Sequence, residues 1–399
     1  MKRSKLLITM VMISFGISGC NIDKSIILKD ANETVQNIKD AEKEIFKDSK
    51  KIAEFYREIY EHALNEENQL NLDTVKSIVK LLGEAGYAAV DNENQVDMVN
   101  PNKVKQFAEK VENKEEAEIT IICVLYNGGF VRYDLNTKEG KVEVIRTSIT
   151  WKDKMPEVNY REEYFAHTWV YSEEGYLFFE QYHMPGFDGP SGHTAIRVKA
   201  LDERSRELNR KYLIPIGYNL NNMFTTDWSE GDYKQLNFYD LYERMYQLKY
   251  GKPVSDKSEH EGKSYEIPKT EFQDVFQSYF KINSQILQQK TVYHAGSKTY
   301  QYRPRGMFDF APTPNIPYPE VVSYNEEQDG TIMLTVNAVW PEENLAKAFS
   351  HVVVIRPLTD GRFQYVSNHV IHSKENMEPT WYRDRLTDEE WANYYGAAE

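Results

Sequence analysis

The sequence predicts an α+β protein made of antiparallel sheets with packed helices, arranged as two domains. Between residues 73 and 111 apolar residues recur with the period of helices, and from residue 119 they alternate as in strands. The chain repeats this order later, with a helical pattern over 269–290 followed by four strand-like runs. The intervening segment 251–266 has almost no apolar residues, which is typical of a linker.

The first 19 residues are predicted to be a secretory signal peptide. A basic start at residues 2–5 precedes the apolar run Leu6–Ile17, which is too short to cross a membrane as a helix. The next residues, Ile17-Ser18-Gly19-Cys20, have the form of a lipobox, in which small side chains flank the cysteine that the processing enzymes must reach. We expect cleavage between Gly19 and Cys20 and acylation of Cys20 by chains such as palmitate.

Acylation of Cys20 predicts that the mature chain is anchored on the extracytoplasmic face of the cell membrane, with residues 20–29 as a tether. Stable anchoring takes two or more acyl chains, each buried methylene contributing about 0.8 kcal/mol. The alternative is that Leu6–Ile17 stays uncleaved as an anchor and that the cysteine is incidental.

The charge balance argues against a nucleic-acid partner. The formal net charge is −14, and it becomes −17 once residues 1–19, which carry three positive and no negative charges, are removed. Nucleic acids and anionic lipid surfaces attract clusters of lysine and arginine, and none is visible. Besides Cys20 the only cysteine is Cys123, which lies in the strand-like run 119–125 and is expected to be buried, without a disulfide.

The N-terminal α+β domain is predicted over 30–250 and begins with a long helix over 30–62. Four isoleucines recur there every seven residues, which gives a helix with one narrow apolar seam: Ile38, Ile45, Ile52 and Ile59. The favoured interpretation is a helix packed on its own domain, and a stalk or coiled-coil partner site is the alternative. Two shorter helices follow, one over 73–85 and one from Asn102.

Alternating residues then predict a meander of antiparallel strands. The runs 119–126 and 130–134 are joined by Asn127-Gly128-Gly129, which supplies the positive φ angles of a tight hairpin. Further strands are expected over 141–150, 164–171, 176–183 and 194–199, and helices over 202–211 and 237–248.

The C-terminal domain is predicted over 267–375, after the linker. A helix over 269–290 precedes strands over 320–324, 331–340, 351–357 and 364–371. This order resembles the cystatin- or NTF2-like layout, which encloses a pocket between helix and sheet; the resemblance concerns shape and implies little about function. The tail, 376–399, contains Thr387-Asp-Glu-Glu390, a capping box that opens a short helix through Tyr395.

Two blocks of sequence carry a further resemblance. Arg197–Gly217 (RVKALDERSRELNRKYLIPIG) and Phe238–Glu243 (FYDLYE) resemble an uncharacterised family of lipoproteins from Gram-positive bacteria. The resemblance covers nearly the whole mature chain. It implies no catalytic residue and no ligand, because that family has no assigned activity.

Aromatic residues suggest one binding chemistry. Tyrosine is the compositional outlier, with 28 residues, and aromatic faces stack on the sugar rings of envelope glycan. The alternative is that tyrosines and tryptophans serve as ordinary strand and core residues. The tryptophans in question are Trp169, Trp228, Trp340, Trp381 and Trp391.

Histidines suggest a second chemistry. His351 and His369 lie symmetrically about the turn at 359–362, with His372 nearby, and antiparallel pairing would place the two imidazoles opposite each other. His183 and His193 flank a loop rich in glycine and proline. Paired imidazoles can share a zinc or copper ion, but no third ligand is evident, so no metal site and no cofactor are assigned.

No catalytic residue is assigned either. The sequence has no Gly-x-Ser-x-Gly elbow, no His-Glu-x-x-His and no glycine-rich phosphate loop that opens a helix. The pairs Glu162-Glu163 and Glu173-Glu174 are adjacent in strands or turns, so neither pair converges on one bond.

These observations favour a non-enzymatic lipoprotein that binds a small ligand or another envelope protein through its C-terminal domain. Two alternatives stay open. One is a cell-envelope hydrolase whose site no linear motif reveals, and the other is a structural or assembly factor that acts through the helix at 30–62.

The Cys20→Ser substitution tests the anchor. We expect the variant to leave the membrane fraction, because it cannot carry the acyl chains that hold the wild-type protein there. The measurement is an immunoblot of membrane and soluble fractions after a carbonate wash, with the wild-type protein as control. Retention of Cys20→Ser in the washed membranes would show that the anchor lies elsewhere.

Overall fold

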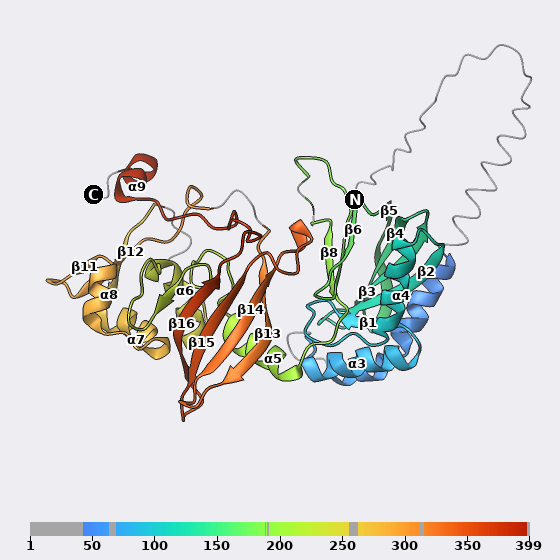
Figure 1. The fold of residues 1–399 in the computed structure, drawn as a ribbon, viewed down its shortest axis with the longest axis horizontal. Helices are drawn as coiled ribbons and strands as arrows, with labels where there is room; N and C mark the ends of the chain where they lie inside the picture. The colour runs from blue at the N-terminus through green and yellow to red at the C-terminus, as the bar shows by residue number, and fades with distance from the viewer. Residues whose placement is uncertain are drawn as a thin grey trace, which may run out of the picture.

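A computed structural model of the chain describes residues 43–63, 69–187, 189, 191–254, 262–310 and 315–396. It shows two units side by side, the N-terminal unit on the right of Figure 1 and the C-terminal unit on the left. Helices pack on largely antiparallel sheets in both, which confirms the α+β class. The signal peptide, Gly19 and Cys20 lie outside the described residues.

The N-terminal unit is built on a five-stranded sheet in the order β1-β2-β3-β4-β5. β1 pairs parallel with β2, and the remaining neighbours are antiparallel, so the predicted meander with its turn at Asn127–Gly129 is confirmed. The short β1 and the highly charged β5 were not predicted. The strands are β1 (Ala88–Asp91), β2 (Ala117–Val124), β3 (Phe130–Lys138), β4 (Lys141–Lys152) and β5 (Met155–Phe165).

Both faces of this sheet are buried. In β2, Ile122 and Val124 pack on one side against the first helices, while Ile121 and Cys123 pack on the other side against α4 and a second sheet. Successive strand residues point to opposite faces, so the continuous apolar run of β2 supplies two cores at once. The helices span residues 43–54, α2 (Arg57–Ala63), α3 (Leu72–Glu84) and α4 (Pro101–Glu112).

The isoleucine seam of the first helix faces the core of its own unit. Ile52 is fully buried, and Ile45 and Ile59 are half-buried. The helix is interrupted at residues 55–56, where the Tyr56 hydroxyl donates a hydrogen bond to the Gly128 carbonyl (2.9 Å). The favoured interpretation of the seam is therefore confirmed for residues 43–63; Ile38 lies outside the described part of the chain.

A second sheet, in the order β6-β7-β8, forms the wall between the units. Leu177 and Phe179 of β7 face the N-terminal core, whereas Tyr176 and Phe178 face Val339 of the C-terminal unit. The single strand expected over 164–171 is two strands in different sheets, β5 and β6, because the chain turns between them. The bounds are β6 (Thr168–Tyr171), β7 (Tyr176–Glu180) and β8 (His193–Arg197).

The chain crosses to the C-terminal unit through α5 (Glu203–Leu208), which continues as a π-helix over Asn209–Leu213. From Leu208 onward the buried side chains belong to one large core. This core does not divide at 251–266, where the linker was expected, because α6 (Phe238–Tyr250) packs with the strands that follow it.

The C-terminal unit has a five-stranded antiparallel sheet in the order β13-β14-β15-β16-β9 and a small sheet, β10-β12-β11. The four long strands were predicted, and the short ones were not. The large sheet comprises β13 (Tyr318–Glu326), β14 (Ile332–Val339), β15 (Ser350–Pro357), β16 (Phe363–Ile371) and β9 (Trp228–Ser229), and the small one β10 (Tyr265–Pro268), β11 (Tyr293–His294) and β12 (Thr299–Tyr302).

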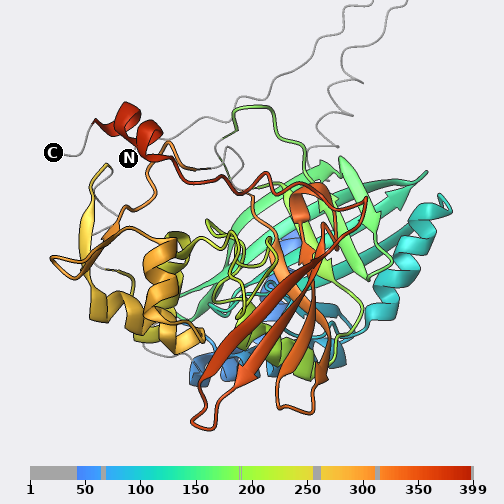
Figure 2. The same ribbon diagram turned by 60° about the vertical axis from the view of Figure 1, so that its left-hand side comes forward.

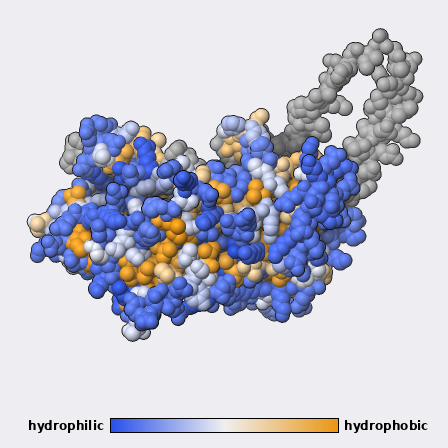
Figure 3. Space-filling view, viewed as in Figure 1, coloured by the Kyte–Doolittle hydropathy of each residue, from blue (hydrophilic) through white to orange (hydrophobic). Residues whose placement is uncertain are grey.

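The outer face of the large sheet is partly apolar. Met333, Val352 and Val354 are half-buried there, between strand neighbours. Figure 3 shows hydrophobic residues gathered on the middle of the face in view, between more hydrophilic ends.

The helix expected over 269–290 is broken in two, α7 (Lys269–Tyr279) and α8 (Ser284–Lys290). Phe280 leaves the helix because its side chain enters the core, where its ring lies 5.5 Å from Trp228 and 5.8 Å from Tyr365. Asn283 then caps α8 by accepting a hydrogen bond from the Ile286 N–H (2.9 Å). A cystatin- or NTF2-like layout encloses a pocket between its helix and its sheet. In this unit aromatic side chains such as Phe280, Trp228 and Tyr365 fill that space.

A buried carboxylate holds the end of the chain against α6. Asp240 is fully buried and accepts hydrogen bonds from Arg305 (2.8 Å), Arg385 (2.7 Å) and the Tyr382 hydroxyl (2.9 Å). Figures 1 and 2 show the segment after β16 running across the C-terminal unit to α9 (Asp388–Tyr395). The predicted capping box at the start of α9 is confirmed.

His351 lies in the centre of the C-terminal core. Its Nδ1 donates to Asn368 (2.7 Å), and its Nε2 accepts from the Tyr218 hydroxyl (2.9 Å). Burial lowers the pKa of His351 from 6.5 to about 4, so the imidazole is neutral over most of the acidic range.

The depressed pKa of His351 predicts a loss of stability in acid. Between pH 6.5 and 4 the unfolded chain binds a proton at this position and the folded chain does not, so the free energy of unfolding falls as the pH falls. Between pH 6.5 and 4 the titration of His351 lowers the free energy of unfolding by about 3 kcal/mol. Urea unfolding of the wild-type protein and His351→Gln across the window should show a steeper decline for the wild type, and parallel curves would contradict the prediction.

Candidate functional site

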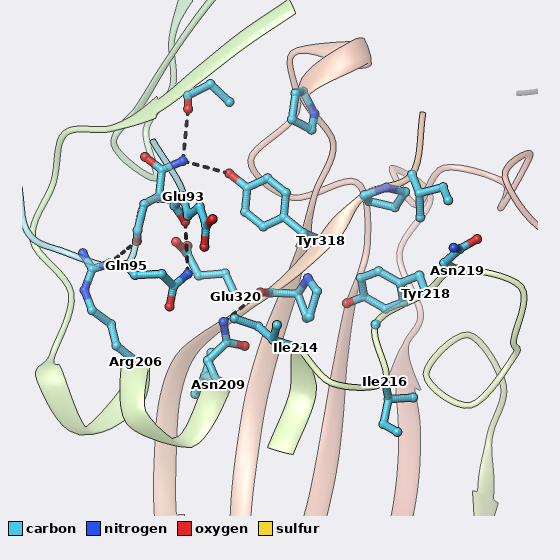
Figure 4. Close-up of a pocket in the computed structure, with 18 of the residues that line it drawn as sticks. Glu93, Gln95, Arg206, Asn209, Ile214, Ile216, Tyr218, Asn219, Tyr318 and Glu320 are labelled. Atoms are coloured by element: carbon cyan, nitrogen blue, oxygen red, sulfur yellow. Dashed lines mark hydrogen bonds between the residues drawn. The ribbon is translucent and has the colours of Figure 1, made fainter. Parts of the chain in front are cut away.

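A cavity of about 550 Å³ lies between the two units. Its walls come from the loop after β1, from β7 and β8, from α5 and the segment that follows it, and from the start of β13. Figure 4 shows Glu93, Gln95 and Arg206 on one side and Tyr218 and Asn219 on the other. The volume is within the range of sites that bind small molecules.

The loop after β1 is held in shape by Asp91. Its buried carboxylate accepts hydrogen bonds from the backbone N–H groups of Glu93 (3.2 Å), Gln95 (3.0 Å) and Val96 (2.7 Å). Burial raises the pKa of Asp91, and these donors oppose the shift. The loop thereby presents Glu93, Asn94 and Gln95 to the cavity.

Asn94 ties this loop to the dividing sheet. It has a left-handed backbone (φ 57°), which asparagine tolerates better than most residues. Its side chain accepts from the Arg197 N–H (2.8 Å) and donates to the Ala195 carbonyl (3.0 Å). The Asn94 side chain thus bonds to the backbone of β8 as a neighbouring strand would, and it joins the loop to that strand.

A buried ion pair crosses from β8 to β13. The Arg197 guanidinium donates to the Glu320 carboxylate (2.7 Å), and only 4% of Arg197 and 6% of Glu320 are exposed. The Tyr176 hydroxyl also donates to Glu320 (2.7 Å), and Arg197 lies over the Tyr176 ring. Burial raises the pKa of Glu320, while Arg197 and Tyr176 oppose the shift.

Two tyrosines extend this network along the cavity. The Tyr318 hydroxyl donates to the Tyr176 hydroxyl (3.2 Å) and accepts from Asn94 (3.4 Å). Burial raises the pKa of Tyr176 and of Tyr318 above the usual value, so both phenols are protonated. They act here as hydrogen-bonding groups and not as nucleophiles.

Helix α5 and the π-helix that follows it form another part of the cavity wall. Arg206 donates to Asp97 (2.6 Å) and to the Asn94 carbonyl, and Asn209 donates to the Pro319 carbonyl (3.0 Å). The buried Oδ1 of Asn209 accepts no hydrogen bond from the described residues, and the same holds for Oε1 of Gln95. Both residues line the cavity, but these two oxygens are themselves closed off from solvent.

The block Arg197–Gly217, noted in the sequence for its resemblance, forms much of this site. Arg197, Arg206, Asn209 and Ile214 all belong to it. No site residue was assigned to the cavity from the sequence, because its parts are far apart in the chain. The one feature of the sequence that could have indicated the site is the concentration of arginines in Arg197–Gly217, a block that ends in apolar residues.

The histidine candidates do not form a metal site. His351 pairs with Val370 and not with His369, and the offset places His351 in the core while His369 is exposed. His183 stacks on Phe187, and His193 lies near Glu180. Within the described ranges no group of three or more potential ligands is close enough to hold a metal ion.

The other candidates are also placed by the structure. Cys123 is buried in β2, as predicted, and burial raises the pKa of its thiol to about 12. Glu162 is paired with Arg146 and Glu163 with Arg161, on separate sides of β5. Four of the five tryptophans considered for glycan stacking are core residues: Trp228, Trp340, Trp381 and Trp391.

The profile of a family of unknown function (DUF6070) matches residues 42–385. The chain belongs to DUF6070. The match spans both units, and every residue that lines the inter-unit cavity lies within it. No curated protein and no solved structure shows significant similarity to the chain.

Among the described residues of this DUF6070 protein, no helix combines the length and the apolar character required to span a membrane.

The Arg197–Glu320 pair predicts a large loss of stability when it is broken. We expect Arg197→Met to lower the free energy of unfolding by about 3–5 kcal/mol, because Glu320 is then buried without its counter-charge. The double variant Arg197→Met/Glu320→Leu should lose less. The measurement is urea unfolding, with Arg204→Met as the matched control, since the Arg204–Glu207 pair is exposed and should change stability by less than about 1 kcal/mol. An equal loss of unfolding free energy in Arg197→Met and Arg204→Met would contradict the prediction.

Proposed function

We propose that this protein is a lipid-anchored lipoprotein of the extracytoplasmic membrane surface that binds a small ligand in the cavity between its units. The observation that carries the binding proposal is the cavity itself. Hydrogen-bonding groups from both units converge on it, and apolar residues such as Ile214, Ile216 and Pro317 complete its walls. Such a combination of apolar walls and a few placed polar groups is typical of ligand sites.

The anchoring part of the proposal rests on the sequence of residues 1–20. The lipobox Ile17–Cys20 and the short apolar run Leu6–Ile17 supply it. Residues 20–29 are the tether in this proposal, which leaves the cavity free to meet solutes outside the membrane.

Binding is favoured over catalysis by the state of the polar groups. Glu320 is engaged by Arg197 and Tyr176, and the phenols of Tyr176 and Tyr318 have raised pKa values. Glu320, Tyr176 and Tyr318 therefore stabilise the walls of the cavity, and none of the three is an activated nucleophile. Hydrolysis stays an alternative that the same experiment detects as a change in the mass of the ligand.

Filling the cavity should abolish binding. Ile214 is 45% exposed at the cavity, so Ile214→Trp adds bulk there without overpacking the core. Ile371→Trp is the matched control, because Ile371 is similarly exposed on β16 and does not line the cavity.

The probe is the dialysable fraction of a cell-wall digest, added to the purified mature protein. We expect it to raise the melting temperature of the wild type and of Ile371→Trp but not of Ile214→Trp. Native mass spectrometry of the same samples identifies the bound species and any product. An equal shift in all three proteins would show that binding occurs outside the cavity.

A further inference from the structure

Arg244 is the one cavity arginine that has no carboxylate partner among the described residues. In the described part of the chain, every arginine except Arg244 and Arg383 forms an ion pair with aspartate or glutamate. Arg383 is exposed to solvent, whereas Arg244 is half-buried on α6 and lines the cavity. In a chain with a net charge of −14, a half-buried cation without a partner is a conspicuous exception.

Glu93 is a carboxylate of the N-terminal unit that lines the same cavity. Its side chain is exposed at the cavity, and its carboxylate forms no ion pair and no hydrogen bond with the described residues. Burial and the neighbouring Asp91 raise the pKa of Glu93, because no cation or donor compensates it. Glu93 and Arg244 do not form an ion pair with each other either, so each charge is left for a third group.

Three buried polar atoms in residues of the cavity wall have no hydrogen-bond partner among the described residues. Oε1 of Gln95 and Oδ1 of Asn209 are buried acceptors without a donor, and Nε of Arg206 is a buried donor without an acceptor. Asn209 and Arg206 are more than nine-tenths buried.

From these groups we infer that the cavity binds a dipolar ligand, an amino acid or a short peptide, with its ammonium group at Glu93 and its carboxylate at Arg244. The inference rests on the proposed binding function and names the chemical class of the ligand. Apolar side chains of the ligand would lie against Ile214, Ile216 and Pro317.

The size of the cavity agrees with a peptide of a few residues. A sphere of about 550 Å³ is about 10 Å across, which corresponds to about three residues of extended chain at 3.3–3.6 Å each. A single amino acid has the same two charges but a shorter span, so the length of the ligand distinguishes the two sources.

The test is isothermal titration of the purified mature protein with the tripeptide Leu-Ala-Leu. Its N-acetylated, C-amidated and doubly blocked forms, and free leucine, are titrated in parallel. We expect the tripeptide with free ends to bind and each blocked end to weaken binding by about 10- to 100-fold, because a charged hydrogen-bonding group is lost. A leucine affinity equal to that of the tripeptide would assign the site to a single amino acid and so also support the inference.

Two substitutions assign the ends of the ligand. Glu93→Gln should bind the free and acetylated peptides equally, and Arg244→Gln should bind the free and amidated peptides equally. Arg383→Gln, which removes the other arginine without an ion pair, should retain the full discrimination between the peptides.

The outcomes separate this inference from the proposed function. The dipolar ligand is wrong if the doubly blocked peptide binds as tightly as the free one. It is also wrong if no peptide or amino acid binds while the cell-wall digest still raises the melting temperature in a manner that Ile214→Trp abolishes. In both cases the binding function stands. If neither the peptides nor the digest bind in a manner sensitive to Ile214→Trp, both fail.

Discussion

The ion pair between Arg197 and Glu320 is the constraint on which the arrangement of the two units depends. Two charges removed from water are tolerated only when they face each other and their remaining hydrogen-bonding capacity is used. Arg197 meets this condition through Glu320 and the Lys199 carbonyl, and Glu320 through Arg197 and Tyr176. Any rotation of one unit against the other would separate the charges, so the pair fixes the position of β8 relative to β13 and thereby the shape of the cavity.

The dividing sheet makes such a junction possible because its middle strand serves two cores. Alternate residues of β7 face opposite directions, with Leu177 in the N-terminal core and Tyr176 at the junction. A sheet that is buried on both faces cannot slip in register without exposing one set of side chains. The cavity therefore lies between rigid walls, and its polar groups are positioned by strands and by a helix rather than by loops alone.

Much of the fold could be predicted from local patterns. The meander after residue 119, the strands of the C-terminal sheet and the capping box at Thr387 follow from alternation, turn residues and capping residues, all of which act over a few positions. The break at Phe280 could not be predicted, because it depends on tertiary packing against Trp228 and Tyr365. The same holds for the core that begins at Leu208, which joins segments on both sides of the expected linker.

The cavity could not be predicted from local sequence patterns, because the residues that form it are far apart in the chain. Arg197 contacts the carboxylate of a residue 123 positions away and the side chain of Asn94, 103 positions away in the other direction. Such contacts leave no spacing pattern in the chain. The histidine hypothesis failed through register, since a shift of one residue in the pairing of β15 with β16 moved His351 and His369 to opposite faces.

The position of β13 at the border of the large sheet has a consequence for contacts with other protein chains. A border strand with free backbone groups invites pairing with other chains and aggregation. Here α5 and the π-helix pack beside β13, and the opposite border ends in the two-residue strand β9. The junction between the units thus also shields the sheet from recruitment into intermolecular assemblies.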